Sequence, residues 1–229
     1  MNEVNAVYNL AAPSSLPVKI ATYQRRRMFD LFLATCQLPA QDKTILDVGV
    51  TSDKAYESSN YLEAWYPYKQ AITAAGIDDA GFLEQDYPGM RFEKADALDL
   101  PFGDCSFDVV HSSAVIEHVG SFENQIQMIG ECARVARERF FITTPNPWFP
   151  VEFHTMLPLV HWMPKPAFRK LMAAIGKPFF ALEANLNLMS RKELLRAAKT
   201  ACGDEFEISV KSVSLAAWPS NLLLVGKRR

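Results

Sequence analysis

The chain has 229 residues, of which 49% are hydrophobic and 22% are charged, and its formal net charge is −2. This length and this hydrophobic content predict one domain with a sizeable core and a local embellishment. The small net charge argues against a nucleic acid as the main partner, and four widely spaced cysteines without a CxxC pair argue against a zinc site or a disulfide framework.

The N-terminal segment lacks the basic start and the apolar core of a signal peptide, and no stretch reaches the length of a membrane span. We therefore expect a cytoplasmic protein without an integral membrane segment. Residues 1–40 are predicted to form an N-terminal arm, over residues 1–18, and one helix. In that helix apolar residues recur at helical spacing, at Met28, Leu31 and Phe32. Pro39 should end it.

From Ile45 onward, short apolar segments alternate with longer amphipathic ones, a pattern typical of parallel strands joined by helical crossovers. Between the fourth and fifth strands, Ser121 can cap a helix from Phe122 to Ala136. The last two strands are joined through residues 218–221, which is short enough for an antiparallel hairpin. The seven predicted strands lie near residues 44–48, 73–77, 91–95, 107–112, 139–144, 206–213 and 221–227.

The segment from Thr144 to Pro166 differs in composition from its neighbours, because it is apolar but interrupted by prolines. A regular helix cannot run through it. Pro166 suits the first turn of a helix that ends near Gly176, where glycine is a common stop. Ser190 and Glu193 match a capping box, which predicts the start of another helix.

Three of the strand-like segments end in an aspartate, namely Asp47, Asp78 and Asp96. Ligands of an open α/β sheet bind outside the carboxyl ends of its strands. Asp78, or Asp79 as a second choice, can accept hydrogen bonds from both hydroxyls of a ribose. Asp96 can accept one from an adenine amino group, with Leu98 covering the ring. Each aspartate could instead cap a local turn, but their order favours a nucleoside site.

The loop after Asp47 distinguishes between possible cofactors. It contains Gly49 alone, and Thr51 and Lys54 occupy the second and third glycine positions of a dinucleotide motif. A pyrophosphate needs those glycines, because the backbone must approach it closely. S-adenosylmethionine carries an adenosine without phosphate, so the loop favours this cofactor over a nicotinamide dinucleotide.

The ordered motifs around Asp47, Asp78, Asp96 and residues 107–110 resemble the class I S-adenosylmethionine-dependent methyltransferases. More narrowly, the segments 107–119 and 144–154 resemble the methyltransferase type 11 branch, and the resemblance spans roughly residues 40–165 and the final hairpin. It implies an α/β fold with a Rossmann-like, mostly parallel seven-stranded sheet, helices on both faces and an antiparallel C-terminal hairpin. The implied domain covers residues 41–229, with an insertion at about 145–190 that forms an acceptor-side flap.

The same resemblance implies where the cofactor binds. The implied contacts are Asp47 and Gly49 at the methionine moiety, Asp78 at the ribose, Asp96 at the adenine, and Ser112 and Ser113 near the sulfonium. The residues themselves add Asp79 at the ribose, and Ala97 and Leu98 at the adenine, as candidates. The sequence departs from the family at Thr51 and Asp53, where glycines are common. These two side chains are expected to contact the cofactor, with Asp53 at its ammonium group.

Methyl transfer from a sulfonium is a direct displacement, so alignment supplies much of the catalysis and a base matters only where the acceptor must lose a proton. Glu117 and His118 lie just past the fourth strand and are the candidate catalytic residues. The alternative, and commoner, role for such residues is to satisfy local polar groups at the start of a helix.

Glu152, His154 and His161 in the proline-interrupted segment are candidate acceptor contacts, or else solvated residues of an apolar flap. His154 and His161 are seven residues apart, as are His111 and His118, and neither pair has a third ligand at a metal spacing. No metal is therefore predicted.

The leading hypothesis is an S-adenosylmethionine-dependent methyltransferase that acts on a small-molecule, lipid or sugar-derived acceptor. A catalytically inactive binding or scaffold protein of the same fold is the alternative, because Thr51 and Asp53 replace glycines. A nicotinamide-dependent oxidoreductase is disfavoured by the missing glycines. The basic run Arg25–Arg27 is expected to be a solvated helix face rather than an anion site.

Overall fold

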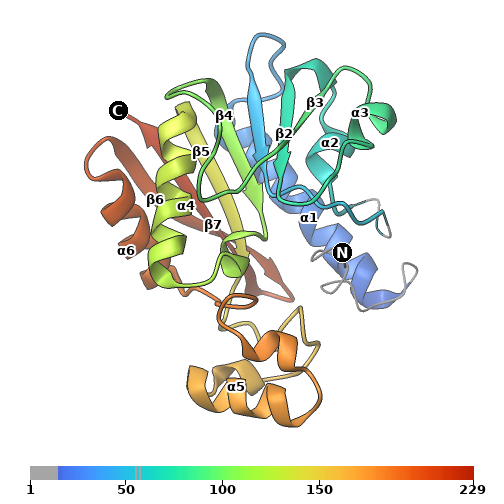
Figure 1. Ribbon diagram of the computed structural model, residues 1–229, viewed down its shortest axis with the longest axis vertical. Coiled ribbons are helices and arrows are strands. Elements are labelled where there is room, and N and C mark those ends of the chain that lie inside the picture. Colours follow the sequence, from blue (N-terminus) through green and yellow to red (C-terminus); the bar gives the residue numbers. More distant parts are fainter. Residues whose placement is uncertain (1–14, 55, 57) are drawn as a thin grey trace.

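The computed structural model describes residues 15–54, 56 and 58–229 of the chain. At its centre is a seven-stranded sheet with the strand order β3-β2-β1-β4-β5-β7-β6 (Figure 1). Strands β1 to β5 are parallel, and β7 is antiparallel to both of its neighbours. The strands are Ile45–Val48 (β1), Ile72–Gly76 (β2), Arg91–Lys94 (β3), Phe107–Ser113 (β4), Ala136–Pro145 (β5), Phe206–Leu215 (β6) and Trp218–Arg228 (β7). The α/β fold expected from the sequence is confirmed.

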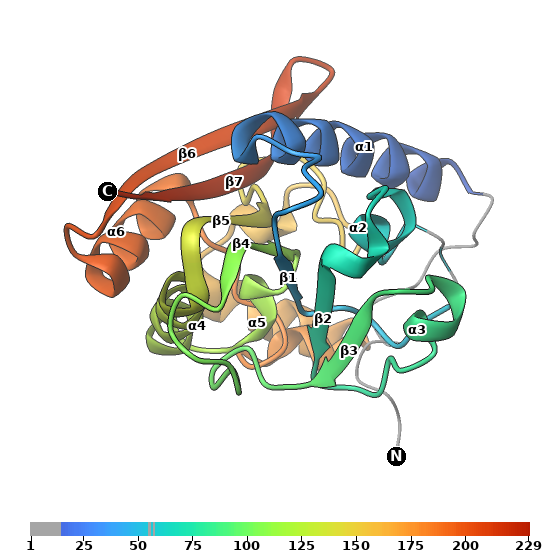
Figure 2. The ribbon, with the colours of Figure 1, turned by 90° about the horizontal axis from the view of Figure 1, so that it is seen from above.

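Helices cover both faces of the sheet (Figure 2). The α-helices are Leu16–Cys36 (α1), Tyr61–Trp65 (α2), Leu83–Asp86 (α3), Phe122–Val135 (α4), Lys165–Ala174 (α5) and Arg191–Cys202 (α6). Short 3-10 helices are Lys69–Ala71 (η2), Ile116–His118 (η3), Val160–Trp162 (η4) and Pro178–Ala181 (η5). Among the described residues, none of the helices combines the length and the apolar character needed to cross a membrane.

Two apolar cores lie on opposite faces of the sheet. Successive residues of a strand point to opposite faces, so Phe140 packs with α4 and α6, whereas Phe141 packs with α1 and α2. Helix α1 contributes Phe29 and Phe32 to the second core, and both are almost fully buried. The N-terminal helix is therefore packed on the sheet directly beside the carboxyl ends of the strands, where it can form one wall of a site.

Helix α1 begins earlier than the sequence suggested. The irregular arm was expected to reach residue 18, but the helix starts at Leu16 with Pro17 in its first turn. Proline is compatible with this position, because the amide N–H that it lacks has no partner within the helix there. The rest of the expected arm, residues 1–14, lies outside the described residues.

The segment between β5 and α6 forms a small body that projects from the sheet (Figure 1). It contains η4, α5 and η5 and has an apolar cluster of its own, made of Phe168, Met172, Phe180 and Leu186. The helix expected near Pro166 is α5, and the capping box at Ser190 and Glu193 is present at the start of α6. We call residues 146–190 the flap.

The final hairpin is confirmed as antiparallel, but its turn lies elsewhere than predicted. Residues 218–221 were expected to connect the strands, whereas β7 already begins at Trp218. The turn consists of Ala216 and Ala217, with φ values of 48° and 66°. Two central residues with positive φ suit a tight hairpin, which usually carries Asn or Gly there. Two alanines give no such signal in the sequence.

Candidate active site

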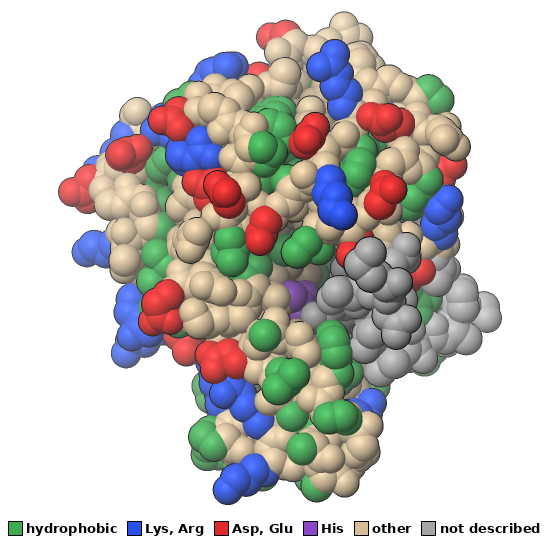
Figure 3. Space-filling model, viewed as in Figure 1, with side chains coloured by type: hydrophobic (Ala, Val, Ile, Leu, Met, Phe, Trp, Pro, Cys, Tyr) green, Lys and Arg blue, Asp and Glu red, His purple; other side chains and the backbone are tan. Residues whose placement is uncertain are grey.

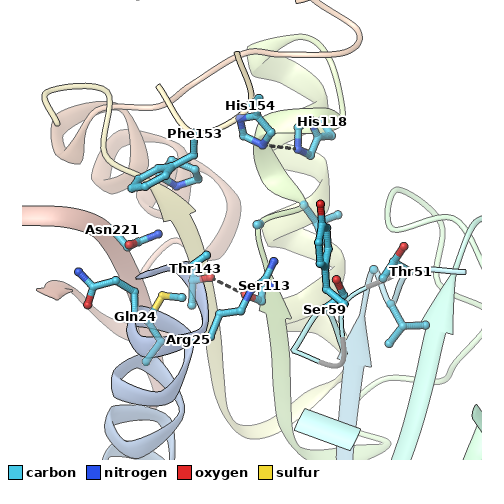
Figure 4. Close-up of a pocket in the computed structure, with 18 of the residues that line it drawn as sticks. Gln24, Arg25, Thr51, Ser59, Ser113, His118, Thr143, Phe153, His154 and Asn221 are labelled. Atoms are coloured by element: carbon cyan, nitrogen blue, oxygen red, sulfur yellow. Dashed lines mark hydrogen bonds between the residues drawn. The ribbon is translucent and has the colours of Figure 1, made fainter. Parts of the chain in front are cut away.

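A cavity of about 720 Å³ lies at the carboxyl ends of the strands, between α1 and the flap. Its wall includes strand-end residues of the sheet, the inner side of α1 and the inner side of the flap (Figure 4). A histidine is visible in the hollow between the sheet and the flap (Figure 3). The strand-end lining includes Gly49, Thr51, Asp96, Ala97, Leu98, Ser113 and Thr143. The cavity is therefore placed where an open α/β sheet holds its ligand.

The loop after β1 turns sharply at Gly49, whose φ is 92°. The N–H groups of Gly49 and Val50 both donate to the carbonyl of Ala75, at 2.7 and 3.1 Å. A Cβ at Gly49 would lie only 2.2 Å from Val115 Cγ2. Glycine is thus required here on two counts, a positive φ and a close approach.

Beyond Gly49, the side chain of Asn60 holds the glycine-poor loop after β1. Asn60 Oδ1 accepts from the N–H of Thr51 at 2.9 Å, and Asn60 Nδ2 donates to the Thr51 carbonyl at 3.0 Å. The Thr51 hydroxyl accepts from the N–H of Asp53 at 3.0 Å. Thr51 lines the cavity and Asp53 does not. Sequence reasoning missed Asn60, because its nine-residue separation from Thr51 matches no local motif.

Of the acids after β2 and β3, Asp96 lines the cavity, whereas Asp78 and Asp79 do not. Asp79 is exposed, and its Oδ1 accepts from the N–H of Gly81 at 2.9 Å, which is the turn-capping role. Asp78 is half-buried and follows Ile77, which lines the cavity. Asp96 lines the cavity, and its Oδ1 accepts from the N–H of Leu98 at 2.9 Å. The Asp96 carboxylate therefore has a fixed direction beside the wall formed by Leu98.

Asp47 lies below the cavity rather than in its wall. Its carboxylate is 2.7 Å from His111 Nδ1, and His111 Nε2 is 2.9 Å from the Tyr61 hydroxyl. The reason is its place in β1, where it pairs with His111 of β4 and points toward the core beneath α1. Burial raises the pKa of Asp47 to about 7 and lowers the pKa of His111 to about 4. Burial and the nearby Asp47 hold the pKa of Glu63 well above its usual range.

The two serines at the end of β4 have different roles. Ser112 is buried and donates to the Val48 carbonyl at 2.8 Å, so it joins β1 to β4. Ser113 lines the cavity, and its hydroxyl lies 3.0 Å from the hydroxyl of Thr143 in β5 (Figure 4). Of these predicted contacts, the structure brings Ser113 to the cavity and leaves Ser112 behind it.

Glu117 and His118 lie in η3, at the flap end of the cavity. Glu117 is fully buried, and its Oε2 accepts from the Thr144 hydroxyl at 2.9 Å. Burial raises the pKa of Glu117 to about 7. His118 lines the cavity, and its Nδ1 donates to the Asn185 carbonyl at 2.7 Å. Burial and the neighbouring His154 lower the pKa of His118 to about 3.

His154 of the flap faces His118, with 3.1 Å between their Nε2 atoms (Figure 4). Its Nδ1 is 2.7 Å from Glu152 Oε1, and the Glu152 carboxylate also accepts from the backbone N–H groups of His154 and Thr155, at 3.0 and 2.6 Å. Burial opposes the charge on Glu152, but His154 and these donors outweigh it and lower the Glu152 pKa to about 2. Against the effect of burial, Glu152 raises the pKa of His154.

His161 is not part of this group. Its Nε2 lies 2.8 Å from the Phe149 carbonyl within the flap, and it does not line the cavity. Glu117, His118 and His154, by contrast, present one potential ligand atom each, and these atoms lie within 4.8 Å of one another. The expectation of no metal came from histidine pairs seven residues apart in the sequence. His118 and His154 are 36 residues apart and meet only through the flap, so no sequence spacing indicates this set.

The basic run of α1 divides into three environments. Arg26 is exposed and pairs loosely with Asp30 at 3.8 Å, as expected for a solvated face. Arg27 donates to the Ser214 carbonyl at the hairpin. Arg25 instead lines the cavity and donates to the Ser58 hydroxyl at 2.9 Å. Burial lowers its pKa, and within the described part of the chain it has no ion pair with a carboxylate.

A seven-stranded sheet of this topology, with a cavity over the carboxyl ends of its strands, defines the fold of the class I S-adenosylmethionine-dependent methyltransferases. Residues 58–141 match the family model of the methyltransferase domain. This match identifies a methyltransferase domain in that part of the chain. No curated protein matches the sequence.

Solved structures with the same fold have distant sequences. A methyltransferase from Methanosarcina mazei is 18% identical with a TM-score of 0.54, and the match covers 85% of this chain and 96% of that one. A possible histamine N-methyltransferase from Thermotoga maritima is 14% identical, with a TM-score of 0.55 and coverages of 92% and 94%. Magnesium protoporphyrin IX methyltransferase from Synechocystis PCC 6803, with bound SAH, is 17% identical, with a TM-score of 0.57 and coverages of 98% and 92%. At these identities the likeness concerns the fold alone.

Proposed function

We propose that the protein transfers the methyl group of S-adenosylmethionine to a small-molecule, lipid or sugar-derived acceptor that binds between the strand ends and the flap. One observation carries this proposal: a single cavity is lined both by the strand-end residues Gly49 and Asp96 and by Phe153 and His154 of the flap. A cofactor and an acceptor can therefore meet in one cavity, which the displacement requires.

The residues at the strand ends fit the cofactor. Gly49 lines the cavity without a side chain, so its backbone can approach the methionine moiety closely. S-adenosylmethionine supplies a methyl group activated by its sulfonium. In the proposed pose, the adenine lies at Asp96, Ala97 and Leu98, the ribose near Gly76 to Asp79, and the methionine moiety at Gly49 and Thr51, with Ser113 nearest the sulfonium. Asp47 and Ser112 support this wall from behind, and Asp53 fixes the loop through Thr51.

Arg25 is the proposed partner for the carboxylate of the cofactor. Its guanidinium reaches the cavity from α1 and is held by Ser58, close to the loop after β1. A half-buried cation without a carboxylate partner in the described residues gains most from an incoming anion, because burial disfavours its unpaired charge. The assignment gives α1 a direct function in addition to its packing on the sheet.

The flap forms the acceptor side of the proposed site. Phe149, Val151, Phe153 and Met156 give this end of the cavity an apolar wall, and His118 and His154 are the polar groups that face it. An acceptor with an apolar body and a polar reacting group fits this combination. Glu117 and Glu152 are buried behind the histidines and act on the acceptor only through them. His161 bonds to the Phe149 carbonyl within the flap and lies outside the cavity lining.

Calorimetry with S-adenosylhomocysteine tests the cofactor site directly. Asp96→Ala should weaken binding about tenfold, because a hydrogen bond to a buried ligand contributes roughly 1–1.5 kcal/mol. Asp99→Ala is the matched control, since Asp99 follows in the same turn and does not line the cavity. No binding to the wild-type protein at millimolar concentration would refute the proposal. Transfer of a labelled methyl group from S-adenosylmethionine into fractionated extract would then identify the acceptor class.

A further inference from the structure

We propose that Glu117, His118 and His154 bind a divalent transition-metal ion at the flap end of the cavity, and that this ion holds an oxygen atom of the methyl acceptor. The three potential ligand atoms lie within 4.8 Å of one another. They come from two separate parts of the fold, since η3 follows β4 and His154 belongs to the flap. The role toward the acceptor rests on the proposed function, whereas the ion site itself does not.

The hydrogen bonds of the two imidazoles fix which nitrogen carries the proton. His118 Nδ1 lies 2.7 Å from the Asn185 carbonyl, which can only accept, so Nδ1 is protonated. His154 Nδ1 lies 2.7 Å from the carboxylate of Glu152, which also accepts two backbone N–H groups. In neutral rings, both Nε2 atoms then carry lone pairs, and these point at each other across 3.1 Å. Two facing lone pairs require a positive charge between or beside them.

Glu117 supplies the negative charge of the set. It is fully buried, and its Oε2 is fixed by the Thr144 hydroxyl at 2.9 Å. Its Oε1 is buried and has no hydrogen-bond partner in the described part of the chain, and it lies 4.0 Å from His118 Nε2. A buried carboxylate oxygen without a partner is costly, because it has lost its water. A cation at this point would satisfy Glu117 and both imidazoles together.

The distances suit a single ion with small adjustments. Two nitrogens bound at about 2.1 Å to one ion lie roughly 3.0–3.4 Å apart, for bond angles between octahedral and tetrahedral. The observed separation of the Nε2 atoms is 3.1 Å. Two ligands on opposite sides of such an ion lie about 4.2 Å apart. Glu117 Oε1 lies 4.0 Å from His118 Nε2, which is within that range. The Glu117 carboxylate would have to move toward the imidazoles to complete the site.

Neighbouring groups orient the ligands as they do in metalloproteins. Metal-binding histidines commonly donate their other N–H to a carboxylate or a backbone carbonyl. Here His154 uses Glu152 and His118 uses the Asn185 carbonyl. Glu152 is itself held by backbone N–H groups, so the whole arrangement is fixed before an ion arrives. Two imidazoles and one carboxylate favour Zn²⁺, Mn²⁺, Fe²⁺ or Co²⁺ over Mg²⁺ or Ca²⁺, which prefer oxygen ligands alone.

The position of the three ligands relative to the cavity indicates what the ion would do. His118 and His154 line the cavity, whereas Glu117 approaches from behind them. A remaining coordination position would therefore face the acceptor. An ion there would bind and orient the oxygen of a hydroxyl or phenol group, so the acceptor class is an oxygen nucleophile rather than an amine.

The test measures metal binding by the protein alone. After removal of metal with a chelator, the wild-type chain should bind one Zn²⁺ or Co²⁺ by calorimetry and metal analysis, and bound Co²⁺ should give a visible absorption spectrum. His154→Ala and Glu117→Gln should each weaken binding more than 100-fold, beyond the ~10–100-fold that orienting residues contribute. His161→Ala is the control, because it removes a histidine of the same flap outside the set and should bind as the wild type does.

Several outcomes would overturn the inference. If folded wild-type protein binds neither Zn²⁺, Mn²⁺ nor Co²⁺ below millimolar concentration, a proton shared by the imidazoles occupies the place assigned to the ion. Equal losses in His161→Ala and His154→Ala would indicate non-specific binding. Should His154→Ala fail to fold by circular dichroism, Glu117→Gln decides, because its amide oxygen can still accept from Thr144. Binding of S-adenosylhomocysteine, measured separately, shows whether the proposed function stands without the ion.

Discussion

Two buried clusters of carboxylates and histidines flank the strand ends, and they differ in what surrounds their acids. Asp47, Glu63 and His111 lie beneath α1, and His111 has its pKa lowered to about 4. At the flap, Glu152 keeps its charge because backbone N–H groups bond to it, and it raises the pKa of His154. Below about pH 7 the acids of the first cluster are therefore protonated, whereas the second cluster contains the ionised Glu152 and faces the cavity. Backbone N–H groups that donate to a carboxylate, more than the types of residue present, therefore decide whether a buried acid stays ionised.

Removal of the histidine from the first cluster should have the largest effect. His111→Ala should lower the free energy of unfolding by about 3–5 kcal/mol, because it empties a fully buried site beside Phe32 and Phe141 and leaves the Asp47 and Tyr61 polar groups without their partner. Urea denaturation measures the change. The matched variant His161→Ala should cost about 1 kcal/mol or less, since that ring is only half-buried in the flap. Equal costs would mean that His111 has no special structural role.

Protonation of Asp47 predicts an unusual dependence of stability on pH. Its pKa is about 7 in the folded chain and 3.8 in the reference state, so between these values the folded state binds more protons than the unfolded state. Asp47 therefore lowers the free energy of unfolding as pH rises from about 4 to about 7, by up to ~4 kcal/mol at ~1.4 kcal/mol for each pKa unit. His111, with its pKa lowered to about 4, contributes the opposite slope, so only a comparison of variants isolates Asp47.

Asp47→Asn provides that comparison, because a neutral amide can still donate to His111. The advantage of the variant over the wild type in urea denaturation should be small at pH 4, about 1.5 kcal/mol at pH 5 and ~4 kcal/mol at pH 8. A wild type that is the more stable of the two at pH 8 would show that folding does not raise the pKa of Asp47. The cluster would then resemble the charged one at the flap, and the contrast between the two ends would be lost.

Glu152 tests the charged cluster in the same way. Glu152→Gln keeps the shape but removes the charge that orients His154, so we expect the affinity for Zn²⁺ or Co²⁺ to fall about 10–100-fold. Calorimetry on the metal-free protein measures it. Glu183→Gln is the control on the same flap, since Glu183 makes a half-exposed ion pair with Arg169 at 3.0 Å. An unchanged affinity in Glu152→Gln would mean that the carboxylate only supports the fold of the flap.

The sequence was sufficient for the strands and the longer helices, but not for α2, α3, the hairpin turn or these two clusters. Apolar runs and the capping box at Ser190 located the strands and α6, because such signals are local. Asp47 was read as a cofactor contact, since a strand end does not reveal which face its side chain takes once a helix covers that face. His118 and His154 meet only because the flap returns to the sheet, with Asn187 N–H donating to the Glu117 carbonyl at 2.7 Å. No spacing rule anticipates that contact.

The smallest expected effect concerns the loop after β1. The cluster of Asp47, Glu63 and His111 lies behind this loop. Asn60 bonds to both the N–H and the carbonyl of Thr51, so Asn60→Ala should leave the loop less ordered without removing any contact to the cofactor. Ordering it again on binding should cost about 1 kcal/mol, which weakens S-adenosylhomocysteine roughly fivefold in calorimetry. Asn124→Ala removes a similar bond, to the Val119 carbonyl at 2.8 Å, away from this loop and should leave the affinity unchanged. If both variants bind as the wild type does, the glycine-poor loop keeps its shape without Asn60, and the turn at Gly49 alone must hold it.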